Sequence, residues 1–243
     1  MRYVDAHMHL DLMEQPDAYL RRAVDAQAGL FSCTVEPQAY HPALDGFGGS
    51  PYVRVGLGLH PWWVAADPAQ AQAQEQLDSF LQQVPAASFV GEVGLDFSPK
   101  HEATAQAQMA ALRAILEACA SLGGKVVSVH CVKAYPQLFD LLQQTGALGN
   151  NAIILHWFSG AHDQLLQARE WGCFFSVGER MLSAKRGRAY LKDMPINKLL
   201  LETDAPPEGA GIRQAFSMVA DLLGQRAAKQ TTENGCALFG FGL

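Results

Sequence analysis

The strongest constraint on the fold is a regular alternation of short apolar segments with longer segments of helical periodicity. Apolar runs of this length are typical of buried strands, and the segments between them repeat apolar residues at the spacing of amphipathic helices. Repeated strand–helix units favour a parallel sheet whose crossovers are helices. The eight predicted strands cover residues 3–10, 30–35, 53–60, 89–96, 126–131, 152–158, 173–178 and 199–204.

Seven helices are predicted, at residues 17–27, 68–83, 101–122, 134–144, 161–171, 181–192 and 212–229. The remaining crossover, residues 37–51, contains Pro42 and three glycines, so we expect at most one short helix there. Eight strand–helix units in 243 residues match the ~250 residues typical of a TIM-type (β/α)8 barrel, and a doubly wound open sheet is the alternative. No linker divides the chain, which predicts a single domain over residues 1–243, with residues 231–243 closing the bottom of the barrel.

Charge and cysteine content exclude several classes of protein. The formal net charge is −6, so no strongly basic face is available to bind nucleic acid by charge alone. The five cysteines include no Cys-x-x-Cys pair, which argues against a disulfide scaffold or a thiolate zinc site. The first residues lack the apolar core of a signal peptide, and no stretch reaches the ~18 apolar residues of a membrane span. We therefore expect a cytoplasmic protein that does not enter a membrane.

Polar residues that can bind metal gather near the carboxyl ends of the predicted strands, where barrels of this type place their chemistry. Residues i and i+2 of a strand share a face, so His7 and His9 can bind one ion. Glu92 and Asp204 lie within apolar strands, and a buried carboxylate needs a partner. A shared divalent ion would satisfy all of them. Nitrogen and oxygen ligands suit zinc, manganese or iron, and carboxylate bridging also permits magnesium. The histidines at these strand ends are His7, His9, His60, His130 and His156.

An ordered set of motifs resembles the TatD family of metal-dependent hydrolases over nearly the whole chain. The motifs are DAHMHL at 5–10, GLHP at 58–61, GEVGLD at 91–96, VHC at 129–131, LHWFSG at 155–160 and LETDAP at 201–206. The LHWFSG motif is also similar to that of a divergent branch of the family found in bacterial anti-phage operons.

The resemblance implies a barrel with two divalent ions, magnesium, manganese or zinc. His7, His9 and Asp204 would hold one ion, His130 and His156 the other, and Glu92 would bridge them. Known members are deoxyribonucleases that trim DNA from the 3′ end. Two ions can activate a water and stabilise both oxygens of an in-line displacement, and Asp204 would also orient or deprotonate that water. The expected activity is therefore a 3′-to-5′ exonuclease on single-stranded or frayed DNA, with Glu92 and Asp204 as catalytic residues.

Three residues are candidates for contact with substrate. His60 resembles the family's Gly-x-His-Pro element and can hydrogen-bond a phosphate, and Trp62 can stack on a base. Family members carry arginine two residues after the fifth-strand histidine, whereas this chain has Val132 there and then Lys133, which we expect to replace the lost cation. The segment after residue 207 is also shorter than in the family, which predicts a more open mouth. Asp96 and Glu202 are expected to orient the metal-binding imidazoles.

Two other functions are compatible with these residues. One is an amidohydrolase-like enzyme that cuts an amide or ester bond of a small molecule. The other is a metal-binding barrel that serves as a subunit of a defence or repair complex without turnover. We expect a monomer, because nothing in the surface composition identifies a self-interface.

Overall fold

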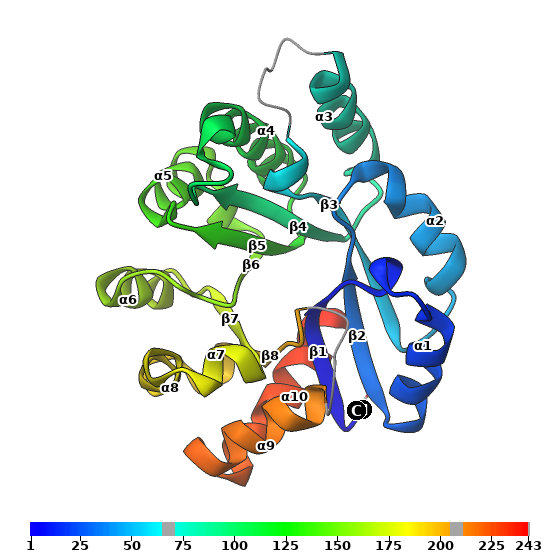
Figure 1. The fold of residues 1–243 in the computed structure, drawn as a ribbon, viewed down its shortest axis with the longest axis vertical. Helices are drawn as coiled ribbons and strands as arrows, with labels where there is room; N and C mark the ends of the chain where they lie inside the picture. Colours follow the sequence, from blue (N-terminus) through cyan, green and yellow to red (C-terminus); the bar gives the residue numbers. More distant parts are fainter. Residues whose placement is uncertain (65–70, 205–210, 243) are drawn as a thin grey trace.

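The chain folds into a closed barrel of eight parallel strands, each hydrogen-bonded to its sequence neighbours, with helices outside the ring (Figure 1). The computed structural model describes residues 1–64, 71–204 and 211–242. β1 also pairs with β8, through Asp5 and Leu201, which closes the ring and excludes an open sheet. The strands are β1 (Tyr3–Met8), β2 (Ala28–Cys33), β3 (Val53–Leu59), β4 (Phe89–Asp96), β5 (Val126–Val132), β6 (Ala152–His156), β7 (Phe174–Val177) and β8 (Leu199–Leu201). The predicted (β/α)8 fold is confirmed.

Helices connect the strands and cover the outside of the barrel. The α-helices are α1 (Pro16–Asp25), α2 (Pro37–Phe47), α3 (Ala71–Gln83), α4 (Ala105–Leu122), α5 (Tyr135–Thr145), α6 (His162–Glu170), α7 (Glu179–Ser183), α8 (Lys185–Leu191), α9 (Ile212–Leu223) and α10 (Gln225–Phe239). Five 3-10 turns complete the described elements: η1 (Leu10–Leu12), η2 (Pro61–Trp63), η3 (Glu102–Thr104), η4 (Ala147–Gly149) and η5 (Ile196–Lys198). Within the described ranges, no helix combines the length and apolarity needed to cross a bilayer.

Three helix predictions need correction. The expectation of at most a short helix in 37–51 underestimated α2, which has 11 residues and buries Tyr40 and Ala43 despite Pro42 inside it. The helix predicted at 181–192 is two helices, because Ala184 is extended. The helix predicted at 212–229 breaks at Gly224, whose φ of 92° suits glycine. The predicted helix start at residue 68 and the shorter segment after residue 207 fall in 65–70 and 205–210, outside the described residues.

The contact between α7 and α8 explains why the chain turns at Ala184. A Cβ at Gly187 would lie 2.0 Å from the carbonyl oxygen of Met181, so only glycine permits this approach. Arg188 then donates to the carbonyl oxygens of Leu182 and Ser183, which are the orphan acceptors at the end of α7. α7 is therefore held firmly at the carboxyl side of β7.

Apolar side chains from the chain terminus fill the bottom of the barrel, as predicted for residues 231–243. Phe239 and Phe241 are 1% and 6% exposed and pack with Phe31, which is 0% exposed. Arg54 donates to the carbonyl oxygens of Phe239 and Gly240 and so fixes the terminus under the ring. The opposite end of the barrel interior, at the carboxyl ends of the strands, is polar and is described next.

Candidate metal centre

The carboxylate of Glu92 on β4 lies at the centre of the barrel mouth, 3% exposed and within 3.3 Å of five histidine rings. Its two oxygens divide these rings between them. Oε2 faces the Nε2 atoms of His7 and His9 on the β1 side, whereas Oε1 faces His60, His130 and His156. The distances to Glu92 are 3.3 Å for His7, 3.2 Å for His9, 3.2 Å for His60, 2.8 Å for His130 Nδ1 and 2.8 Å for His156 Nε2.

Glycines let the strands around Glu92 approach closely. A Cβ at Gly94, whose φ is 153°, would lie 2.0 Å from the carbonyl oxygen of His130 on β5. A Cβ at Gly58 on β3 would lie 1.7 Å from the carbonyl oxygen of Thr34. Gly58 thus lets β3 approach the segment that follows β2, and Gly94 lets β4 approach β5, so side chains from separate strands meet at one carboxylate.

Two histidines show that the donor set suits a cation. Nδ1 of His9 lies 2.8 Å from the carbonyl oxygen of Cys33, which can only accept, so this nitrogen carries the proton of the neutral ring. Nε2 of His9 then presents a lone pair to the Glu92 carboxylate, an arrangement that requires a proton or a metal ion between them. Nε2 of His7 is buried and has no hydrogen-bond partner among the described residues, while Nδ1 of His7 hydrogen-bonds with Ser128 Oγ at 2.7 Å. Buried orphan nitrogens of this kind are typical of metal ligands.

Asp204 follows β8 and completes the β1 side of the cluster. The predicted strand 199–204 ends earlier, at Leu201, because Asp204 has a φ of 54° and its backbone N–H donates to the His7 carbonyl oxygen. Asp5 helps to fix this segment by accepting hydrogen bonds from the N–H and Oγ1 of Thr203. Asp204 Oδ1 consequently lies 3.6 Å from His7 Nε2, and its side chain is 20% exposed. His7, His9 and Asp204 form one group whose ligand atoms lie within 4.8 Å of one another.

The pKa values of the cluster show how it carries charge without metal. Burial would raise the pKa of Glu92, but the facing His60, His156 and His7 hold it well below its usual range. Burial would lower the pKa of His9 and of His130, but hydrogen bonds to carboxylates outweigh it and raise both to about 9. The pKa of His7 falls to about 4 because of burial. Protons on His9 and His130 thus provide positive charge that divalent ions would otherwise supply.

Asp96 and Glu202 contact the outer side of the cluster, as the sequence predicts. Asp96 Oδ2 lies 3.3 Å from His130 Nε2 and also accepts the indole N–H of Trp62 at 2.6 Å. Glu202 accepts from the backbone N–H of Trp157, hydrogen-bonds with Ser176, and has Oε2 3.8 Å from His156 Nδ1. These contacts orient His130 with Nδ1 and His156 with Nε2 toward Glu92.

A cavity of about 630 Å³ opens above the cluster. His60, Trp62 and Asp204 line it, and so does the aliphatic side chain of Val132, at the position where the family carries arginine. Lys133 is exposed, has a φ of 55°, and is not among the lining residues. Arg180 on α7 is the lysine or arginine among the described residues that line the cavity, and the sequence-based prediction did not include it. Its only signal in the sequence is its place directly after the seventh strand.

Comparison with known proteins agrees with this architecture. The family model described as TatD related DNase matches residues 4–240. The 3'-5' ssDNA/RNA exonuclease TatD of Edwardsiella piscicida is 38% identical over 125 residues, which cover 50% of this chain and 47% of that protein. The match therefore spans about half the length of that relative. Human deoxyribonuclease TATDN3 is 26% identical over 265 residues, with 97% of this chain and 94% of that protein covered.

A solved structure shows the same fold. The crystal structure of YJJV, a TatD homologue from Escherichia coli K12, superposes with a TM-score of 0.84 at 22% identity and covers 99% of both chains. The family model spans the motifs that contribute every residue of the cluster around Glu92. The chain therefore belongs to the family of TatD related DNases.

Proposed function

We propose that this protein is a metal-dependent nuclease that removes nucleotides from the 3′ end of single-stranded or frayed DNA. The observation that carries the proposal is a buried carboxylate with imidazoles on both of its oxygens, at the floor of an open cavity. Membership of a DNase family supports it, as do relatives named for 3′-5′ exonuclease activity. A small-molecule amidohydrolase is not favoured by these relatives.

We infer that the residues would hold two divalent ions. His7, His9 and Asp204 would hold one on the Oε2 side of Glu92, and His130 and His156 would hold the other on the Oε1 side. When bound, magnesium, manganese or zinc would lower the pKa of a water and stabilise charge on the phosphodiester. Glu92 would fix the spacing of the two halves of the site.

Asp204 is the carboxylate of the cluster that is best placed to exchange a proton with the cavity. Its side chain is 20% exposed, against 3% for Glu92, and both line the cavity. We assign to Asp204 the role of orienting the attacking water and accepting its proton.

His60 lies within reach of Glu92, but its hydrogen bonds indicate a different role from the metal ligands. Nδ1 of His60 accepts the backbone N–H of Trp62 at 3.2 Å, so the neutral ring carries its proton on Nε2. Burial lowers the pKa of His60 and so favours the neutral ring. A protonated Nε2 cannot bind metal but can donate to a phosphate oxygen, and we assign His60 to that contact.

Trp62 is 48% exposed on the cavity rim, where its ring stacks on His101 with a centroid distance of 4.9 Å. Stacking of a base on an aromatic ring contributes about 1–3 kcal/mol. Lys133 would contact the strand outside the cavity, where it is exposed. We also propose that one chain is sufficient for activity, because all groups of the cluster come from it. The five cysteines are free and buried, which fits a reducing compartment such as the cytoplasm.

A time course on 5′-labelled single-stranded DNA, and on RNA of the same sequence, tests the proposal. Reactions contain magnesium, manganese, zinc or a chelator, and the His130→Ala variant is the control. We expect a ladder that shortens from the 3′ end and disappears with chelator and in the variant. If protein with bound metal cleaves neither DNA nor RNA, the nuclease assignment is rejected. Size-exclusion chromatography of the active fraction tests whether the active species is a monomer.

A further inference from the structure

Arg180 differs from the other basic residues near the cavity. Among the described residues that line the cavity, it is the sole lysine or arginine, and its side chain is exposed. It makes no hydrogen bond or ion pair with any residue in the described ranges. By contrast, Arg186 donates to the carbonyl oxygens of Ser159 and Gly160, and Arg188 caps α7. Within the described ranges, the guanidinium of Arg180 therefore has no partner that a ligand would need to displace.

The backbone presents Arg180 from a fixed position. Met181 and Leu182, which follow it, are 4% and 0% exposed and anchor α7 in the core. A Cβ at Gly178, just before α7, would lie 2.8 Å from the carbonyl oxygen of Glu202. The start of α7 is thus packed against the segment that leads to Asp204.

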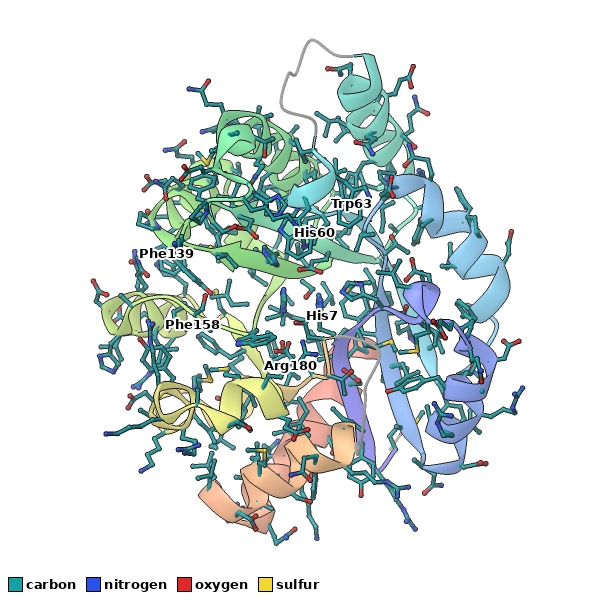
Figure 2. All side chains as sticks on the ribbon, viewed as in Figure 1. His7, His60, Trp63, Phe139, Phe158 and Arg180 are labelled. Carbon is teal, nitrogen blue, oxygen red and sulfur yellow. The ribbon has the colours of Figure 1, made fainter. Side chains whose placement is uncertain are left out.

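Arg180 and the aromatic rim lie on opposite sides of the cluster around Glu92. Trp62 and Trp63 follow β3, Arg180 follows β7, and these strands are four positions apart in a ring of eight. Figure 2 shows the same order, with His60 and Trp63 on one side of His7 and Arg180 on the other. The cavity therefore offers a flat apolar surface, then the cluster, then a guanidinium.

We propose that Arg180 forms a second anion subsite, which binds the phosphate next to the scissile one. This inference rests on the proposed nuclease function. If a base stacks on the aromatic rim and the scissile phosphate lies at the cluster, the DNA strand continues toward the opposite rim. The next phosphate of the strand then lies near Arg180. A guanidinium binds phosphate through two parallel hydrogen bonds, which lysine cannot reproduce. The subsite would select oligonucleotides over mononucleotides and small esters.

The test pairs Arg180 variants with substrates that lack one charge. Single-stranded oligonucleotides carry one neutral methylphosphonate, at each linkage near the 3′ end in turn. We expect Arg180→Gln to lower kcat/KM on the unmodified strand roughly 10- to 100-fold, the range for charge-assisted hydrogen bonds. One neutral linkage should cause a similar loss in the wild type but little further loss in Arg180→Gln, and Arg180→Lys should recover only part of the rate.

Two controls separate this subsite from general charge effects. Arg226→Gln removes the same charge from an exposed arginine on α10, outside the cavity lining, and should stay within about twofold of the wild type. Lys133→Gln tests the other candidate cation. Three results would overturn the proposal. The first is an equal loss of kcat/KM in Arg180→Gln and Arg226→Gln, and the second is a loss confined to Lys133→Gln. The third is that the effect of Arg180→Gln and the effect of each neutral linkage simply add.

Binding without turnover distinguishes failure of the subsite from failure of the nuclease assignment. Fluorescence anisotropy of a labelled oligonucleotide, in chelator, should show weaker binding to Arg180→Gln than to Arg226→Gln. If the wild type cuts DNA and Arg180→Gln matches it, only the subsite is rejected. If the wild type neither cuts nor binds oligonucleotides, both proposals are rejected. Thermal melting of each variant confirms that it is folded.

Discussion

The two ends of the barrel interior are equally buried but are built from opposite chemistry. At the bottom, Phe31 and Phe239 pack together with their ring centroids 4.9 Å apart, and they are 0% and 1% exposed. At the mouth, His7 and Glu92 are 0% and 3% exposed. Full burial of an apolar side chain contributes about 1.5–3 kcal/mol, whereas burial of a charge is unfavourable unless it is compensated. The bottom therefore stabilises the fold, and the mouth is maintained at a cost in stability.

Polar groups sharpen this contrast. Near the bottom, the buried ammonium of Lys125 donates to the carbonyl oxygens of Val84 and Ala87, so its hydrogen bonds are made within the protein. At the mouth, Nε2 of His7 faces the Glu92 carboxylate and is buried without a hydrogen-bond partner in the described part of the chain. A satisfied buried charge indicates a structural role, and an unsatisfied ring nitrogen beside a buried carboxylate indicates a site that awaits a ligand.

The largest predicted effect follows from removing the central charge of the mouth. Glu92→Gln keeps the volume of the side chain but removes the negative charge that faces both sets of imidazoles. We expect kcat/KM to fall by at least about 10²- to 10³-fold, the scale of losing one preorganised electrostatic group. The free energy of unfolding without metal should not fall by more than about 1 kcal/mol, because the histidines can become neutral. Initial rates and urea unfolding measure the two quantities, and a stable but active variant would refute the central role of Glu92.

At the bottom, the same comparison predicts the reverse outcome. Phe239→Ala should lower the free energy of unfolding by about 3–5 kcal/mol, the cost of removing a buried aromatic ring. The rate per folded molecule should remain within about twofold of the wild type, because the ring lies far from the cluster. Leu238→Ala, a truncation of the partly buried neighbour, is the matched control and should cost about 1 kcal/mol or less. A loss of rate in folded Phe239→Ala would show that the two ends are coupled.

Metal binding should make the mouth contribute to stability. When the concentration of a divalent ion is 100 times its Kd, binding to the folded state raises the free energy of unfolding by about 2.7 kcal/mol. We expect manganese or zinc to raise the Tm of the wild type and of Phe239→Ala by similar amounts, and to have a much smaller effect on Glu92→Gln. Differential scanning calorimetry with and without chelator measures this. Equal shifts in all three proteins would place the bound ion elsewhere.

The sequence predicts much of this arrangement because strand periodicity is a local property. The eight apolar runs identify the barrel, and the i, i+2 spacing brings His7 on β1 and His9, which follows the end of β1 at Met8, to the same carboxylate oxygen. Helix and strand ends depend on distant contacts instead. The break between α7 and α8 depends on the close approach of Gly187 to the Met181 carbonyl oxygen. The end of β8 depends on the hydrogen bond from the Asp204 N–H to the His7 carbonyl oxygen. Neither contact has a signal in the sequence around it.

The cations of the site show the same limit. Lys133 was chosen because it is near His130 in the sequence, but the backbone turns after β5 and leaves its side chain exposed. Arg180 is 50 positions after His130, yet the closed ring brings β7 to the same cavity as β5. Local spacing identifies ligands on strands, whereas Arg180 on α7 is placed by the packing of its helix.

The smallest predicted effect concerns the rim, where one hydrogen bond links substrate binding to the cluster. Trp62→Phe keeps an aromatic face but removes the N–H that Asp96 Oδ2 accepts, and Asp96 also contacts His130. A hydrogen bond of this kind contributes about 0.5–1.5 kcal/mol, so kcat should fall roughly 2- to 10-fold while KM changes little. Trp62→Ala should raise KM as well, because the stacking surface is lost. Trp63→Phe, the same change at a neighbour that makes no hydrogen bond to Asp96 among the described side chains, should leave kcat within about twofold. If both phenylalanine variants lose kcat equally, the rim acts only as a surface, and the link from Trp62 through Asp96 to His130 has no part in positioning the metal ligands.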